Sequence, residues 1–262
     1  MNTMNANLQA RYAQPAEPVV QDLLATYGVR VNTDLVRDAQ CATISVRQQQ
    51  GPFTFSSQVS FPYLPLASGF SNKNHIVKDL GSIVLFFASS LDTSGSAARG
   101  ITAEVLVSSS PRSGRQNGFI MIDPFQQYTE KDFPEANIPL AVLLEGSFQS
   151  HSSPPTEKTM SAATRIVVVG DGDFMLDEYL GNPGNVSFFA NIVDYLADDA
   201  GLITIRSKNL DTPPLEPVSD AMKPVIKYGN LIVPPLMVVV YGLVRWRKRL
   251  ARKKGLEVKP GS

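Results

Sequence analysis

The sequence predicts an α/β protein in which a mostly parallel, Rossmann-like sheet flanked by helices is followed by one C-terminal transmembrane helix. Three observations predict this fold class: uninterrupted apolar runs of strand length, an amphipathic helical pattern after one of them, and a long apolar stretch followed by a basic cluster. The chain has 262 residues, 43% hydrophobic and 18% charged, a composition that excludes a mostly disordered protein.

The N-terminal part predicts one short helix and then less regular structure. Within residues 18–27 a proline opens and Gly28 closes a run whose apolar positions recur at helical spacing: Val19, Val20, Leu23, Leu24 and Tyr27. From residue 41 to residue 70, short alternating apolar runs are broken by glycine and proline. This pattern predicts edge strands or an extended excursion.

The middle of the chain contains the strand candidates. Ser82–Ala88, Pro139–Leu144 and Arg165–Val169 are continuous apolar runs bounded by polar residues or glycine. Such runs are typical of strands covered on both faces, as in a parallel sheet between layers of helices. Ile101–Val107 is a fourth candidate, and Leu202–Ile205 is a short fifth.

The strongest helix candidate is residues 185–200. We expect Asn185 to cap it, Gly201 to end it, and one apolar stripe to face the core, formed by Val186, Phe189, Ile192, Val193 and Leu196. Between the runs at 165–169 and 202–205, this helix predicts a right-handed βαβ unit. The remaining segments predict two Ser/Pro-rich loops and a stiff spacer, at 108–117, 149–158 and 212–217.

The C-terminal region has the pattern of a membrane span and its anchor. Residues 225–244 are apolar over about 30 Å of helix, the thickness of a bilayer core, with a kink expected at Pro234-Pro235. Residues 245–254 contain seven basic residues. The expected anchoring residues are interfacial aromatics and the first basic side chains: Tyr228, Trp246, Arg245, Arg247, Lys248 and Arg249. A buried helix of a globular domain is the alternative, but no polar stripe interrupts this segment.

The charges are distributed unevenly. Residues 225–262 hold 9 of the 24 basic and 1 of the 24 acidic residues, which leaves 15 basic and 23 acidic residues in 1–224. The positive-inside rule therefore predicts an extracytoplasmic domain at 1–210, a linker at 211–224, the span at 225–244 and a cytoplasmic tail at 245–262.

This orientation requires export, yet the first 20 residues contain no apolar stretch of signal-peptide length. Two explanations remain open. The chain is the C-terminal part of a longer protein, which we favour, or the protein is tail-anchored and its domain stays in the cytoplasm.

The most site-like motif is Gly170-Asp171-Gly172-Asp173-Phe174, directly after a predicted buried strand, where open α/β sheets place their ligands. Asp171 and Asp173 are candidate ligand-binding residues that could hold a divalent cation, with Asp177 and Glu178 as further contributors. The alternative, which we favour, is that both aspartates make turns and cap the next segment.

Other chemistries lack their motifs. No Gly-rich phosphate loop and no G-x-S-x-G elbow occur, and the single cysteine, Cys41, lies in no strand-to-helix turn. His75 and His151 lie in polar segments and are expected at the surface. The acidic balance of residues 1–224 disfavours nucleic-acid binding.

The order of six segments resembles a known family. LLATYGVRVNTDLVRDAQC, NKNHIVKDLGSIVLFFASSLDT, PLAVLLEGSFQS, TRIVVVGDGDFM and NPGNVSFFANIVDYLADDAGLITIRSKN, followed by a span with a basic tail, resemble the C-terminal half of the GldG-like family, the auxiliary component of gliding-motility-type ABC transport systems. The resemblance extends from about residue 20 to about residue 254 of the chain.

The resemblance implies a non-enzymatic subunit of the bacterial inner membrane. Its periplasmic domain would be akin to the glutamine-amidotransferase-like fold, would need no cofactor, and would work with an ABC permease, an ATPase and the lipid bilayer. Family members usually carry a further N-terminal span, which agrees with a truncated chain. Two other hypotheses stay open: a membrane-anchored hydrolase or metal-dependent enzyme centred on Asp171 and Asp173, and a cytoplasmic tail-anchored binding module.

Overall fold

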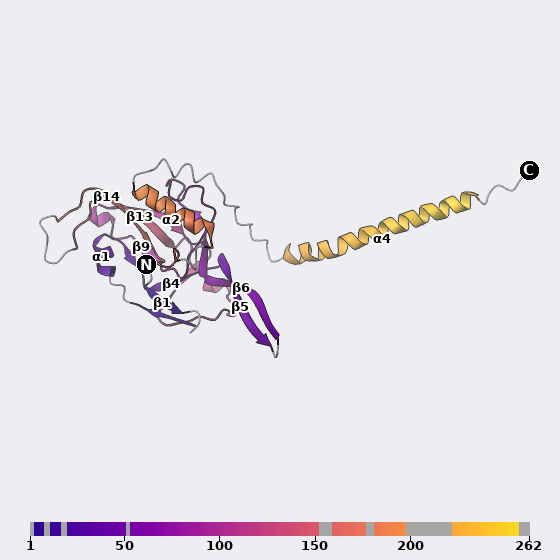
Figure 1. The fold of residues 1–262 in the computed structure, drawn as a ribbon, viewed down its shortest axis with the longest axis horizontal. Coiled ribbons are helices and arrows are strands. Elements are labelled where there is room, and N and C mark those ends of the chain that lie inside the picture. The colour runs from indigo at the N-terminus through magenta and orange to yellow at the C-terminus, as the bar shows by residue number, and fades with distance from the viewer. Residues whose placement is uncertain are drawn as a thin grey trace, which may run out of the picture. The chain divides into compact units, whose positions relative to one another are not determined.

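A computed structural model describes most of the chain, in two compact units that we treat separately (Figure 1). The units are Met1–Pro214 and Leu215–Ser262. The described residues are 3–7, 11–16, 20–50, 53–151, 159–176, 181–197 and 222–256.

The first unit is built around a four-stranded sheet with the order β14-β13-β10-β7. Its strands are β7 (Gly69–Phe70), β10 (Thr102–Ser108), β13 (Pro139–Gly146) and β14 (Thr164–Val169). The three candidates at 101–107, 139–144 and 165–169 are thus confirmed as strands. In the central strand β13, Leu143 lies between Glu104 of β10 and Val167 of β14.

The expectation of a mostly parallel sheet is wrong, because the three strand pairs of this sheet are all antiparallel. The apolar run of β13 correctly indicated a strand buried on both faces. Burial alone does not determine strand direction, however, and the segment between β13 and β14 returns the chain antiparallel.

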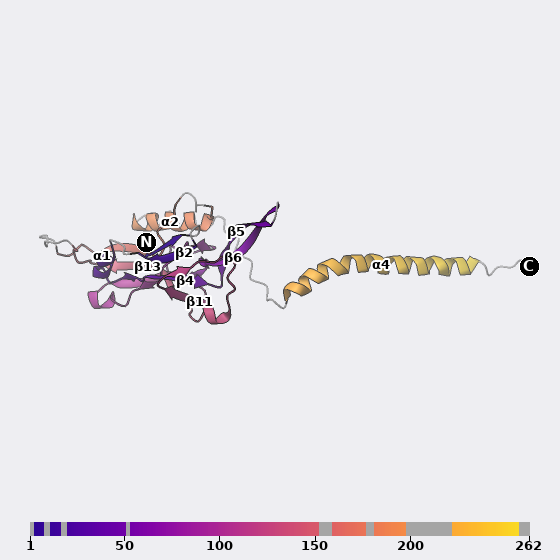
Figure 2. The same ribbon diagram turned by 90° about the horizontal axis from the view of Figure 1, so that it is seen from below.

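Two helices and two hydrophobic clusters cover the faces of β13, so the expectation of a sheet combined with helices is confirmed, although the sheet is antiparallel and not Rossmann-like. On one face, Ala141 and Leu143 join a cluster with Phe188 and Ile192 of α2 (Pro183–Leu196). On the other face, Val142 and Leu144 join a cluster that also contains Val29 and Leu91, against which Leu24 of α1 (Gln21–Thr26) packs. Figure 2 shows α2 lying over the strands.

A third cluster lies among smaller sheets and includes Phe61, Tyr63 and Ile120. One of these sheets has three strands, β1 (Met4–Asn7), β2 (Tyr12–Pro15) and β12 (Ile120–Met121). Two others have two strands each, β4 (Asp34–Asp38) with β11 (Ser113–Asn117) and β3 (Arg30–Val31) with β9 (Leu91–Asp92). Two 3-10 turns, η1 (Ala97–Arg99) and η2 (Glu130–Asp132), complete the described body.

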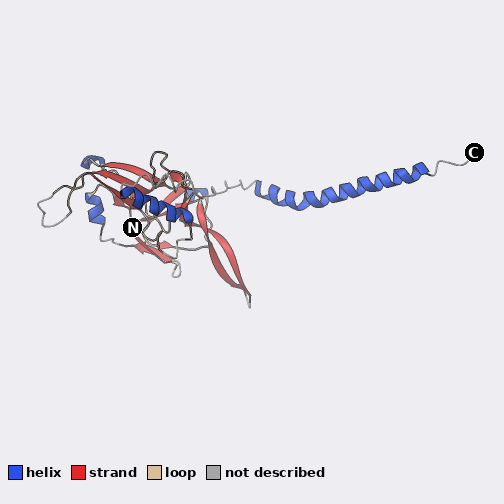
Figure 3. Cartoon of the chain, turned by 45° about the horizontal axis from the view of Figure 1, so that its top comes forward, coloured by secondary structure: helices blue, strands red, loops and turns tan. Residues whose placement is uncertain are grey.

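The predicted edge strands at 41–70 form a long hairpin whose tip projects from the body (Figure 3). It consists of β5 (Cys41–Gln50) and β6 (Phe53–Ala67), and the inner end of β6 pairs with β8 (Ile83–Val84). Towards the tip, Phe53 and Phe55 are exposed.

Residues 82–88 were predicted as one strand, but only β8 is a regular strand here. Beyond it the chain continues beside β6, where Leu85 and Phe87 donate main-chain hydrogen bonds to the carbonyl oxygens of Pro65 and Tyr63. On the other side, the main chain of Val84 and Phe86 bonds to side chains instead of a strand. On this side of the segment, hydrogen bonds to side chains therefore take the place of main-chain bonds to a neighbouring strand.

Two further expectations are corrected. Residues 108–117 were predicted as a loop, yet 113–117 form β11, because a serine- and glycine-containing stretch can pair with β4 when its neighbours hold it there. The cap of α2 is Asn182, whose side chain accepts a hydrogen bond from the Gly184 N–H. Asn185, the expected cap, is buried inside the helix.

The apolar stripe of α2 is also oriented differently from the expectation. Ile192 faces the core, whereas Val186, Phe189, Val193 and Leu196 are exposed. Two asparagines occupy the inward face with Phe188 and Ile192, because their amides bond to buried main-chain groups. The predicted strand at 202–205, the spacer at 212–217 and most of the loop at 149–158 lie outside the described residues.

The second unit contains one long helix, α4 (Met222–Leu256). The expected span at 225–244 falls inside it, and the helix continues through Pro234 and Pro235. Residues Lys227–Arg247 are long and apolar enough to cross a bilayer, and none of that window is buried by the described structure.

The buried side-chain amides of Asn185 and Asn191 on α2 lead to a prediction about stability. Asn185 accepts from the Val84 N–H and donates to the carbonyls of Val84 and Phe174, whereas Asn191 donates only to Ile76. Because Asn185→Ala leaves several buried main-chain groups without partners, we expect a loss of about 3 kcal/mol, against about 1 kcal/mol for Asn191→Ala. Chemical denaturation of both variants in detergent measures the difference. Equal losses would contradict this bridging role.

Candidate functional site

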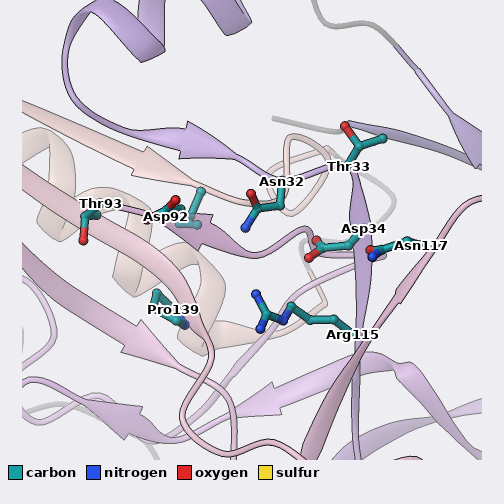
Figure 4. A pocket seen from close by; sticks show the side chains of 9 residues that line it. Asn32, Thr33, Asp34, Asp92, Thr93, Arg115, Asn117 and Pro139 are labelled. Carbon is teal, nitrogen blue, oxygen red and sulfur yellow. The ribbon is translucent and has the colours of Figure 1, made fainter. Parts of the chain in front are cut away.

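A polar pocket of about 680 Å³ opens beside the β3–β4 connection (Figure 4). Its lining comes from segments far apart in sequence: Asn32, Thr33, Asp34, Leu91, Asp92, Thr93, Arg115, Asn117 and Pro139. The side chains of Asn32, Asp34 and Arg115 point towards one another in this view. The pocket is thus assembled by the tertiary fold.

Short strands position these groups. The turn Asn32-Thr33 joins β3 to β4, β9 places Asp92, and β11 carries Arg115 and Asn117 opposite Val36 and Asp34 of β4. In an antiparallel pair, residues directly opposite project on the same face of the sheet. Asp34 and Asn117 therefore meet at the end of the β4–β11 ladder.

Asp34 is buried in the floor of the pocket, with 2% of its surface exposed. Its carboxylate accepts hydrogen bonds from the Ser90 N–H at 2.8 Å and the Ser90 hydroxyl at 2.5 Å. Burial raises the pKa of Asp34 above its ordinary 3.8, and the two hydrogen bonds from Ser90 partly offset this increase. The carboxylate thus fixes the loop after residue 88.

Arg115 supplies the positive charge. Its Nε donates to Glu135 at 2.8 Å, and this bond holds the pKa of the Glu135 carboxyl below its usual range. At the opposite wall, hydrogen bonds from Ser94 lower the pKa of Asp92. The pocket therefore presents a guanidinium and a carboxylate on opposite sides at neutral pH.

This arrangement is suited to binding a polar molecule. The amides of Asn32 and Asn117 and the hydroxyls of Thr33 and Thr93 add donors and acceptors around the two charges. Cysteine and histidine are not among the nine lining residues. A small polar molecule with both donors and acceptors fits this chemistry.

The sequence did not indicate this pocket. Its residues lie in four segments, and each segment alone reads as a turn or a strand end. The proximity of residues 34 and 117 depends on the pairing of β4 with β11, in a stretch that the sequence predicts as a loop.

The predicted site at Asp171 and Asp173 has a different environment. Asp171 is 1% exposed, and its two oxygens accept hydrogen bonds from the Phe86 N–H at 2.6 Å and the Asp173 N–H at 2.7 Å. Burial raises the pKa of Asp171 to about 6. The bond from the Asp173 N–H closes an Asx turn, and the bond from the Phe86 N–H joins the end of β14 to the segment beside β6.

The backbone around Asp171 is equally close-packed. A Cβ at Gly170 would lie 2.0 Å from the Ser89 carbonyl oxygen, so no larger residue fits without a shift. Asp173 is half-buried, and Asp177 and Glu178 lie outside the described residues. Among the residues that the structure describes, no cluster of three His, Cys, Asp or Glu side chains could hold a metal ion.

The other titratable candidates, two histidines and the cysteine, lie away from both the polar pocket and the Asp171 turn. His75 and His151 are exposed, and His151 lies 3.0 Å from the Thr26 hydroxyl. Burial raises the pKa of the Cys41 thiol to about 11, which keeps it protonated and unreactive at neutral pH.

The predicted anchoring residues all lie on α4. Tyr228 and Trp246 are exposed near the two ends of the apolar window, and Arg245 and Arg247 lie at its C-terminal end. Lys248 and Arg249 continue the basic run along the same helix.

Comparison with known proteins identifies the family. The family described as "ABC-type uncharacterized transport system" matches residues 1–198, which include the pocket, Asp171 and α2. The chain belongs to this family. The description of the family links the chain to an ABC-type transport system, and α4 lies beyond the matched residues.

A curated relative from Borreliella burgdorferi (strain ATCC 35210 / DSM 4680 / CIP 102532 / B31) bears the name "Uncharacterized protein". It is 25% identical over 268 aligned positions, which cover 95% of this chain and 50% of the relative. The chain thus spans about half the length of this relative. No solved structure matches.

The buried carboxylate predicts a pH dependence. Since Asp171 has a pKa of about 6 in the fold against an ordinary 3.8, the folded state holds the proton more tightly than the unfolded chain. Its contribution to the free energy of unfolding is therefore largest below about pH 4 and is lost as the pH rises to about 6.

We expect Asp171→Asn, which removes this term, to cost more stability at about pH 4 than at about pH 7. Chemical denaturation of the wild type and the variant across this range measures the two costs. A cost that does not change with pH would show that burial does not raise this pKa.

Proposed function

We propose that the protein is a non-enzymatic, membrane-anchored auxiliary subunit of an ABC transporter of the gliding-motility, GldG-like type. Its domain at 1–210 lies outside the cytoplasm of a bacterial cell and contacts a partner or a substrate. The helix at 225–244 spans the inner membrane and packs against the permease, which works with an ATPase. The tail at 245–262 remains in the cytoplasm.

The observation that carries the proposal is the exposure of α4. Leu236, Val238 and Tyr241 are more than half exposed, as are most of their neighbours in the window. Leaving a large apolar side chain in water costs about 1.5–3 kcal/mol relative to burial, so this helix is unfavourable in water. A bilayer removes that cost, and family membership in an ABC transport system supports a membrane location.

The basic residues after the window support the orientation. Seven of the ten residues at 245–254 are basic, and such clusters stay on the cytoplasmic side. The polar pocket beside Asp34 and Arg115 then faces the outside, where it is the candidate contact for a small polar substrate.

Membrane attachment is tested by charging the centre of the helix. Each arginine at that depth costs about 2.5–3.5 kcal/mol on insertion scales. We therefore expect Val238→Arg with Val239→Arg to shift the protein from the carbonate-resistant membrane fraction to the supernatant. Val238→Leu with Val239→Leu at the same positions is the control and should stay in the membrane. Release of the wild-type protein into the supernatant would contradict membrane anchoring by this helix.

Association and orientation need separate measurements. The wild type, purified in mild detergent, is expected to bring down a permease and an ATPase. In intact cells, a cysteine at the exposed Asp123 should react with a membrane-impermeant maleimide, and one at Ser262 should not. The reverse labelling pattern would support the cytoplasmic tail-anchored module instead.

The enzyme hypothesis at Asp171 and Asp173 is less favoured by the geometry, because both oxygens of Asp171 already accept main-chain hydrogen bonds. It would be supported if Asp173→Asn abolished an activity while the protein stayed folded. We expect Asp173→Asn to leave co-purification with the transporter unchanged.

A further inference from the structure

The polar pocket beside the β3–β4 connection is lined by charges of both signs. Its lining residues all belong to the described ranges 20–50 and 53–151. Arg115 provides a guanidinium, and Asp34 and Asp92 provide two carboxylates. Arg115 interacts electrostatically with both of these carboxylates. A molecule in the pocket therefore meets positive and negative groups within one space.

The guanidinium of Arg115 is held in place without using all of its donors. The Glu135 carboxylate accepts from Nε at 2.8 Å and pairs with Nη2 at 2.5 Å. A guanidinium has five N–H donors in one plane, so the edge formed by Nη1 and Nη2 remains for a second carboxylate. Figure 4 shows this side chain extending towards Asn32 and Asp34. Because Glu135 already orders the side chain, a bound carboxylate does not have to do so.

The two aspartates offer the complementary acceptors. Asp92 is exposed and accepts from the Ser94 N–H at 2.9 Å, whereas Asp34 accepts from the N–H and the hydroxyl of Ser90. These donors are uncharged, and within the described part of the chain neither aspartate forms a direct ion pair. A carboxylate has sites for about four hydrogen bonds, so both can also accept from an ammonium group.

We propose that this pocket binds a small zwitterion of the amino-acid class, with its ammonium group on Asp92 and Asp34 and its carboxylate on Arg115. This assignment rests on the proposed function in taking the pocket as the substrate contact, and it names the class of substrate. A neutral polyol would displace water from the charged groups without supplying counter-charges, which is unfavourable. A zwitterion supplies one counter-charge to each side of the pocket.

The size of the pocket agrees with such a ligand. Its volume of about 680 Å³ lies within the range of roughly 300–1,000 Å³ that is typical of small-molecule sites. Leu91 and Pro139 add apolar groups to the lining, against which the hydrocarbon part of the ligand packs. A free amino acid and a short peptide share this chemistry, and the probes below distinguish them.

Calorimetric titration of the full chain, purified in detergent, tests the ligand class. The probes are the standard free amino acids, the peptide alanyl-alanine and glucose. We expect at least one zwitterion to bind with a Kd below about 0.1 mM. Tighter binding of a free amino acid or of the peptide decides between these two sources. Binding of glucose alone, or of no probe, overturns the proposal.

Two analogues of the tightest zwitterion test its two ends. The N-acetyl form lacks the ammonium group, and the amide form lacks the carboxylate. Since each loses a hydrogen-bonded ion pair, we expect both to bind the wild type at least about tenfold more weakly. Equal binding of the zwitterion and either analogue would contradict the assignment of that end.

Charge-removing variants assign each end to its residue. Asp92→Asn keeps an oxygen for the Ser94 N–H, and Arg115→Gln leaves only the partly exposed Glu135 without its partner, so both are expected to fold. We expect either change to weaken binding of the zwitterion about tenfold or more. The amide form should bind Arg115→Gln as it binds the wild type, and the N-acetyl form should do so with Asp92→Asn. Equal weakening of all three ligands overturns the assignment.

Matched control variants lie outside the pocket. Asp123 accepts from the Phe125 N–H at 3.0 Å, as Asp92 does from Ser94, and Arg47 is exposed on β5. Asp123→Asn and Arg47→Gln remove the same charges and should bind the zwitterion like the wild type. Losses equal to those of the pocket variants would show a general charge effect and overturn the proposal.

The titration is independent of the tests of the proposed function. If the protein fractionates with the supernatant yet binds zwitterions as described, the membrane-anchored role fails and the ligand class stands. If it stays in the membrane with a permease and an ATPase but binds no probe, only the ligand class fails.

Discussion

The fold depends on satisfying the main chain of residues 83–89, which is buried between two parts of the domain. On one side, Leu85 and Phe87 bond to β6, as strand residues would. On the other side, the partners among the described residues are the amide of Asn185, the carboxylate of Asp171 and the Gly170 carbonyl. Because a buried main-chain group without a partner is costly, these contacts fix β14 and α2 against the segment.

This constraint explains why the most site-like motif is occupied by the structure itself. Asp171 follows a buried strand, as a ligand-binding carboxylate often does, yet one of its oxygens accepts from Phe86 of the extended chain and the other from Asp173 in its own turn. The accessible polar groups gather elsewhere, at Asp92, Arg115 and Asn117, where short strand ends leave an open pocket. Asp34 in this pocket is as buried as Asp171, so the difference between the two places is the open space lined by the exposed polar side chains.

The second unit presents one long apolar surface. Residues Lys227–Arg247 of α4 are long and apolar enough to cross a bilayer, and arginines lie at the C-terminal end of this window. This composition supports the membrane attachment that we propose.

The sequence by itself determined the local features: the strands at 101–107, 139–144 and 165–169, the helices at both ends of the domain, and the apolar helix with its basic end. These follow from periodicity and composition, which act over a few residues. Strand direction, the inward placement of Asn185 and Asn191, and the pocket around Asp34 were decided only by the tertiary structure. Each depends on which distant main-chain group needs a partner, and no local pattern contains that information.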